Sequence, residues 1–145
     1  ATTPANQNNF TVNSGAAIGG NGTINLGGGK VLTLANGANF YFDPSATLTV
    51  DGGSVDLGNL SIADILNLDG STAPGTYTLI DGTASFITTN LQNIGPDEAY
   101  ALGGDARAYF EVGSLSLVVA VPEPASLSLL VLGGIACLRR RARVG

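Results

Sequence analysis

Between Phe10 and Ile62 the chain carries short apolar pairs that alternate with polar residues, and this feature most limits what it can fold into. Alternation with a period of two places every second side chain on one face of a half-buried strand. The pairs recur roughly every five to eight residues, so the predicted strands are very short. The pairs are Ile24/Leu26, Leu32/Leu34, Phe40/Phe42, Leu48/Val50, Val55/Leu57 and Leu60/Ile62.

The segments between these pairs have the composition of tight turns. They contain Asn21 followed by Gly22, a triple glycine at 27–29, and Asp43 followed by Pro44. Glycine and asparagine supply positive φ angles, and proline presets a bend. The sequence therefore predicts an all-β chain. Short strands, glycine-rich turns and quasi-regular spacing favour a short-stranded β-solenoid, and a small β-sandwich of hairpins is the alternative.

The second half of the body predicts longer strands. A run at 75–82 is bounded by glycine on both sides, and further strands are expected at 108–111 and 114–121, where Leu115, Leu117 and Val119 alternate. Residues 61–68 are compatible with either one helical turn or a strand, because periodicity is ambiguous over so few residues. Three strands can form a sheet that covers the last face of the core.

The residue types that are absent exclude several kinds of site. The chain has no His, Met or Trp, and its single cysteine is Cys137. An imidazole-activated nucleophile, a Cys/His zinc set and a disulfide within the chain are therefore excluded. Asp51 and Asp56 offer only a thin basis for a calcium site, and solvated turns are the preferred interpretation. We predict no catalytic residues, no metal and no cofactor.

Charge is distributed unevenly along the chain. Residues 1–121 hold ten acidic residues against Lys30 and Arg107, a formal charge of −8, whereas the remainder has four arginines against Glu123, a formal charge of +3. An acidic body has no basic surface to neutralise phosphates. We therefore expect no nucleic-acid partner.

The C-terminus has three features in a fixed order. Pro122, Glu123 and Pro124 come first, and the prolines hold the glutamate in an extended, accessible segment. An uncharged stretch at 125–138 follows, which as a helix spans roughly 21 Å at about 1.5 Å per residue. An arginine cluster closes the tail and orients the segment by the positive-inside rule. The predicted transmembrane residues are Ala125, Leu127, Leu129, Leu130, Leu132, Ile135 and Leu138, and the stop-transfer residues are Arg139, Arg140 and Arg141.

This tail, VPEPASLSLLVLGGIACLRRRARVG, resembles the PEP-CTERM sorting domain. The resemblance implies that an integral-membrane exosortase recognises Pro122, Glu123 and Pro124 and cleaves nearby. It implies export in a Gram-negative bacterium, a transient inner-membrane anchor with a periplasmic body, and delivery to the cell surface or the extracellular polysaccharide matrix. Residues 46–121 resemble the passenger regions of proteins with autotransporter-associated β-strand repeats, which implies a surface-exposed β domain without catalytic residues.

We accordingly expect two parts: a β-rich extracytoplasmic domain at 1–121 and a sorting signal at 122–145 with one hydrophobic helix. Because position 1 is Ala rather than Met, the chain is interpreted as a processed form or the C-terminal part of a longer passenger. The first functional hypothesis is a non-enzymatic envelope or matrix protein sorted by an exosortase. An adhesin or carbohydrate-binding module is the second, and the C-terminal remnant of a larger secreted hydrolase is the third.

Overall fold

A computed structural model describes residues 8–122 of the protein, and this part is all-β, with two short 3-10 helices and no α-helix. The strands are β1 (Phe10–Val12), β2 (Ala17–Gly19), β3 (Gly22–Asn25), β4 (Val31–Leu34), β5 (Asn39–Tyr41), β6 (Leu48–Asp51), β7 (Ser54–Asp56), β8 (Ile65–Leu66), β9 (Gly75–Asp81), β10 (Ser85–Ile87), β11 (Tyr100–Gly103), β12 (Ala106–Glu111) and β13 (Leu115–Ala120). The 3-10 helices are η1 (Ile62–Asp64) and η2 (Pro96–Glu98).

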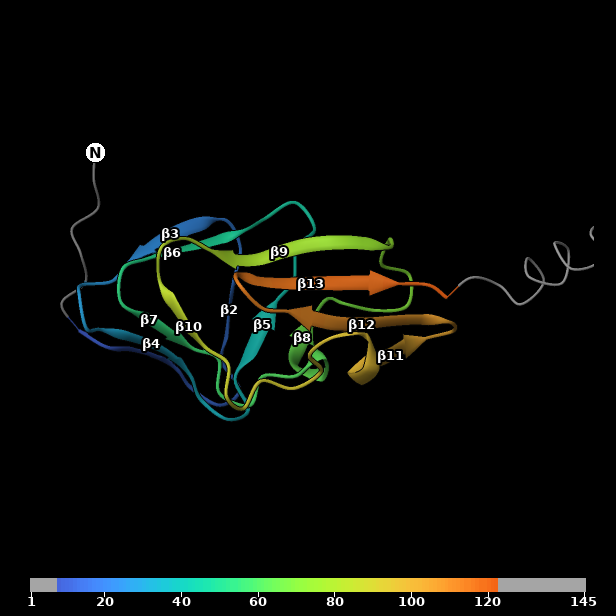
Figure 1. The fold of residues 1–145 in the computed structure, drawn as a ribbon, viewed down its shortest axis with the longest axis horizontal. Helices are drawn as coiled ribbons and strands as arrows, with labels where there is room; N and C mark the ends of the chain where they lie inside the picture. Colours follow the sequence, from blue (N-terminus) through green and yellow to red (C-terminus); the bar gives the residue numbers. More distant parts are fainter. Residues whose placement is uncertain (1–7, 123–145) are drawn as a thin grey trace, which may run out of the picture.

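The first ten strands are arranged in three sheets that the chain visits in turn. β1, β4, β7 and β10 pair in parallel in one sheet, and β2, β5 and β8 pair in parallel in a second. The third sheet contains β3, β6 and β9, also parallel, and continues into β13, β12 and β11, which are antiparallel to their neighbours. Figure 1 shows this third sheet from β3 at the top down to β11.

We call one passage through the three sheets a coil, so that β1–β3 form the first coil, β4–β6 the second and β7–β9 the third. Equivalent positions stack on one another: Phe10 pairs with Leu32, and Leu32 with Val55. The inward-facing residues of successive coils form one continuous apolar core, in which Leu32, Val50 and Val55 are fully buried. Each such side chain contributes about 1.5–3 kcal/mol relative to exposure.

Glycines at the corners let the coils approach one another closely. Gly52 has a φ of +75°, and a Cβ built on it would lie 2.3 Å from the carbonyl oxygen of Leu26 in the coil before. Gly82 has a φ of +114°, and its Cβ would lie 2.2 Å from the carbonyl oxygen of Val50. Both positions need a residue without a side chain, because an L-residue is strained there and would also overlap backbone atoms.

Most strands predicted from alternation are confirmed. Leu32/Leu34 and Leu48/Val50 lie within β4 and β6, and the other pairs up to Val55/Leu57 begin in a strand and end one residue beyond it. The long strands expected at 75–82, 108–111 and 114–121 correspond to β9, β12 and β13.

The prediction of a strand at Leu60/Ile62 is wrong. Leu60 lies outside the strands, and Ile62 begins η1, which leads directly into β8, so the ambiguous stretch at 61–68 contains both a helical turn and a strand. The cause is a capping box: the Asp64 Oδ2 accepts hydrogen bonds from the N–H and hydroxyl of Ser61, each at 2.9 Å. The hydrophobic helix predicted at 125–138 lies outside the described residues.

Candidate functional site

The candidate sorting segment begins where β13 ends. Leu115, Leu117 and Val119 of this strand face the core and are buried, which fixes β13 between β12 and β9. Its last residues are also paired, Val119 with Gly75 of β9 and Ala120 with Arg107 of β12. β13 is therefore paired with β9 up to Val119 and with β12 up to Ala120.

Local chemistry explains why the strand stops there. Pro122 has no backbone N–H to donate to a ladder, and a residue that precedes proline is biased to extended backbone. Val121 is 49% exposed, and Pro122 is also exposed. In Figure 1 the chain leaves the fold at the tip of β13, at the end of the sheet where β9 begins. The motif thus starts at the surface, directly after the paired residues.

Residues 120–142 match the family model of the PEP-CTERM protein-sorting motif. The match begins at Ala120, the last residue of β13, and so spans the boundary between the folded body and the tail. This motif indicates an exported protein with a membrane-anchored sorting signal that an exosortase processes in Gram-negative bacteria. No curated protein and no solved structure matches the chain. The resemblance of residues 46–121 to autotransporter passenger regions stays a prediction.

Among the predicted site residues, the structure describes Pro122 alone. Glu123, Pro124, the predicted transmembrane segment at 125–138 and the arginine cluster at 139–141 lie outside the described residues. In residues 8–122, no helix is long and apolar enough to cross a membrane.

Arg107 was missed as a neighbour of the motif. It lies opposite Ala120 across the β12–β13 hairpin, whose turn contains Gly113. Two alternating apolar segments separated by a short glycine-containing turn indicate a β-hairpin. Aligning the two segments as antiparallel strands would have placed Arg107 beside the residues that lead into the sorting motif.

The two aspartates weighed for calcium do not converge on one site. Asp51 ends β6 and Asp56 ends β7, which belong to different sheets. The Asp51 Oδ1 accepts hydrogen bonds from the N–H and hydroxyl of Thr83 at 3.0 and 3.2 Å, and the Asp56 Oδ1 accepts one from the N–H of Gly58 at 3.0 Å. Within the described part of the chain, no group of three or more His, Cys, Asp or Glu side chains is placed to hold a metal ion.

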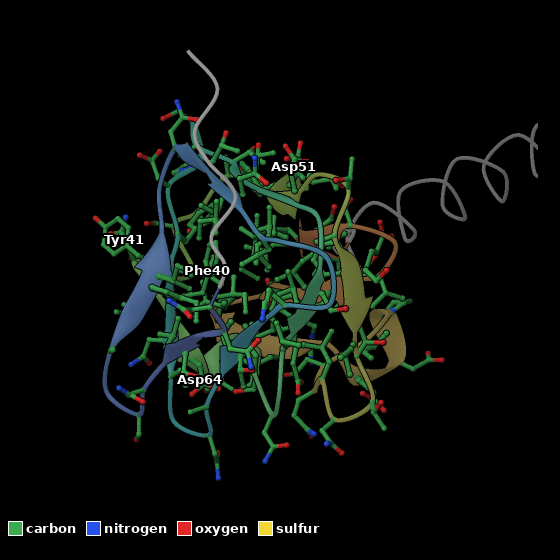
Figure 2. All side chains as sticks on the ribbon, turned by 90° about the vertical axis from the view of Figure 1, so that its left-hand side faces the viewer. Phe40, Tyr41, Asp51 and Asp64 are labelled. Atoms are coloured by element: carbon green, nitrogen blue, oxygen red, sulfur yellow. The ribbon has the colours of Figure 1, made fainter. Side chains whose placement is uncertain are left out.

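Other carboxylates of the body also hold turns or join coils. The Asp81 Oδ1 accepts a hydrogen bond from the Thr49 hydroxyl at 2.9 Å, which joins β9 to β6. Asp64 caps η1, and Figure 2 shows Asp64 and Asp51 at separate places on the body. Through these hydrogen bonds the acidic side chains stabilise turns and join coils, which could not be inferred from their positions in the sequence.

Asp43 and Asp69 follow the second sheet in successive coils and form the same turn. The Asp43 Oδ1 accepts hydrogen bonds from the hydroxyl and N–H of Ser45 at 2.7 and 2.8 Å, and Asp69 is bound in the same way by Ser71. These hydrogen bonds, the hydroxyl's first, lower the pKa of both carboxyls from the ordinary value of 3.8. A bond to the charged form favours that form.

A lowered pKa in the folded state means that each turn stabilises the fold above the unfolded pKa, and that this stability is lost as the pH falls through the folded pKa. We expect Ser45→Ala to raise the pKa of Asp43 toward 3.8 and to leave that of Asp69 unchanged. Titration of the aspartate carboxyl carbons by NMR measures both values. An unchanged Asp43 pKa in the variant would show that the hydroxyl has no part in the shift.

Proposed function

We propose that this protein is an exported, non-enzymatic envelope or matrix protein that an exosortase recognises at Pro122, Glu123 and Pro124. The observation that carries the proposal is the PEP-CTERM match at residues 120–142, beginning where the folded body ends. In this proposal residues 1–121 are the extracytoplasmic domain and residues 122–145 are the sorting signal. The protein acts as a substrate, and its functional site is the segment that the exosortase recognises.

The tail supplies the transient anchor in this mechanism. The uncharged stretch at 125–138 inserts into the inner membrane as a helix, and its roughly 21 Å length is shorter than the ~30 Å hydrocarbon core. Thinning of the bilayer and snorkelling of Arg139, Arg140 and Arg141 make up the difference. The arginines stay in the cytoplasm by the positive-inside rule, so the body is periplasmic.

The exit of β13 supports access by a membrane-embedded enzyme. Ala120 is still paired with Arg107, whereas Val121 and Pro122 are exposed. Among the described residues, a protease that binds an extended segment therefore finds exposed chain after β13 only at Val121 and Pro122. We infer that the cleaved bond lies beyond Ala120 and that β13, with its buried Leu115 and Leu117, stays with the released body.

The architecture of the body fits a structural role. We propose that the three coils form a short β-solenoid, which the antiparallel strands β11–β13 extend and close. Parallel pairing of each strand with the strand three places later supports this proposal, because a sandwich of hairpins would pair consecutive strands antiparallel. A non-enzymatic body is supported by the hydrogen bonds of its carboxylates, which stabilise turns or join coils at Asp51, Asp64 and Asp81.

The mass of the mature protein isolated from the native envelope tests the sorting proposal. We expect the wild type to lack the apolar tail and to end at Val121 or later, and Glu123→Ala to retain the tail, because the recognised carboxylate is gone. Glu111→Ala is the matched control: it removes an exposed carboxylate of β12 and should be processed like the wild type.

Two results would contradict the proposal. An intact tail in all three proteins would leave a β domain with an ordinary anchor. Equal processing of Glu123→Ala and the wild type would show that the exosortase does not recognise the glutamate.

A further inference from the structure

The sheet that contains β13 extends beyond the coils toward the exit of the chain. β9 has seven residues, but only Ile80 and Asp81 at its end pair with β6. The stretch before them, 75–79, runs beside β13 and adds roughly 16 Å at about 3.3 Å per residue. Figure 1 shows β9 and β13 extending past β3 and β6 to the point where the chain leaves the fold. The exit thus lies at one end of the molecule, away from β3 and β6.

Two loops lie level with this exit. β9 begins opposite Val119, so the loop before it, 69–74, lies at the same end of the sheet. The β11–β12 turn at 104–105 lies there too, because β12 begins beside the last residues of β13. The two loops approach each other closely, since a Cβ built on Gly70 would lie 2.8 Å from the carbonyl oxygen of Gly103. We call the surface that they form with the end of the strand the exit face; it consists of residues 69–74, 104–105 and 121–122.

The exit face has the chemistry of a surface that lies against polar headgroups. Apart from Val121 it consists of Asp, Gly, Ser, Thr, Ala and Pro, and all of its residues except the half-buried Thr72 are exposed. It therefore lacks the large apolar side chains with which an interfacial segment enters hydrocarbon. Arg107, the only basic residue described besides Lys30, is exposed beside this face. Its guanidinium offsets the repulsion between the acidic body and anionic lipids.

The connection between the exit face and the proposed anchor is short and stiff. Only Glu123 and Pro124 separate Pro122 from the uncharged stretch at 125–138, a distance of at most about 11 Å in a fully extended chain. Each proline fixes its own φ and biases the residue before it to extended backbone. The headgroup layer is itself about 5–7 Å thick on each side of the hydrocarbon core. The body therefore has little room to turn another side toward the bilayer.

We propose that the exit face is a membrane-facing surface, which lies against the phospholipid headgroups of the periplasmic leaflet while the protein is anchored. This inference rests on the proposed function, because it needs the tail to insert at 125–138. The short connection sets the orientation, and the extended part of β9 and β13 holds the coils away from the bilayer. The far corner of the sheet, between β9 and β10, points into the periplasm.

Quenching of a single fluorophore by labelled headgroups tests this orientation. The full chain, with Cys137→Ala, is reconstituted into vesicles of phosphatidylcholine and phosphatidylglycerol that contain a lipid with a nitroxide on its headgroup. The fluorophore is attached to Ala101→Cys, an exposed position in one row with Arg107 and Ala120, or to Ser85→Cys, an exposed position at the far corner. We expect most of the fluorescence to be lost at position 101 and little at position 85, because quenching by a nitroxide is short-ranged.

A longer connection is the control for the role of the short one. A flexible Gly/Ser segment of about twelve residues between Val121 and Pro122 spans about 17–21 Å on average and lets the body turn. We expect this insertion to remove most of the difference in quenching between the two labelled positions.

Flotation of the vesicles separates failure of this inference from failure of the proposed function. Protein that does not float with the vesicles would contradict the membrane anchor and, with it, the membrane-facing surface. Protein that floats but is quenched equally at both positions, or more strongly at position 85, would overturn the inference alone. So would a difference that persists after the insertion, since the short connection would then not set the orientation.

Discussion

Gly82→Ala is expected to lower the free energy of unfolding by roughly 3–5 kcal/mol, through backbone strain and overpacking together. The φ of Gly82 is +114°, a value that L-residues rarely adopt. A Cβ there would also lie 2.2 Å from the oxygen and 2.8 Å from the carbon of the Val50 carbonyl. Those atoms belong to a central strand, so neither backbone can move aside without disturbing the pairing of β6 with β9. Urea unfolding followed by circular dichroism measures the loss.

Gly103→Ala separates the two contributions to this loss. Gly103 has a similar φ of +125°, but no atom lies within 4 Å of the position that its Cβ would take. We expect this control to show the strain alone, about 1–3 kcal/mol. Equal losses in the two variants would mean that the close approach of the third coil to Val50 adds nothing to the cost.

Phe42→Ala is expected to cost about 3–5 kcal/mol, because it leaves a cavity in the core. Phe42 is 1% exposed and meets the ring of Tyr77 edge to face, with 5.1 Å between the ring centroids. The variant loses this contact as well, and such a pair adds about 0.5–1.5 kcal/mol beyond the buried area. Thermal and urea unfolding of the variant give the change in stability.

The neighbouring residue provides the control for Phe42. Tyr41, which precedes Phe42 in the chain, is 49% exposed on the outward face of β5. Phe40, which precedes Tyr41, is buried and faces the core, as Figure 2 shows. We expect Tyr41→Ala to change stability by no more than about 0.5 kcal/mol. A large loss for Tyr41→Ala together with a small one for Phe42→Ala would show that the alternation of faces along 40–42 is wrong.

The strands that sequence analysis found are those whose signal is local. Leu32/Leu34 and Leu48/Val50 carry two large apolar residues in alternation, and burial of one face follows from that pattern alone. β2 and β10 were missed because neither has two large apolar residues in alternation: Ile18 lies between Ala17 and Gly19, and Ser85 and Ile87 flank Phe86. These segments become strands because a neighbouring coil pairs with them.

The stacking itself is hidden in the sequence because the coils differ in length. Side-chain hydrogen bonds between adjacent coils join residues 22 apart at Asn9 and Val31, 25 apart at Phe42 and Asn67, and 32 apart at Thr49 and Asp81. Loops of different length at the corners absorb the difference, while the strands stay in register. No repeat of fixed length exists to be aligned, and the parallel pairing is visible only in three dimensions.

By itself the sequence determined the all-β class, the principal strands and the sorting motif at the C-terminus, because alternation and a linear recognition signal depend on residues close together in the chain. Only the tertiary structure decided the order of strands in the three sheets, the helical turn at η1 and the exit of the motif beside Arg107. These features depend on hydrogen bonds and packing between residues far apart in sequence, such as Asn93 with Ile62, which no local pattern encodes.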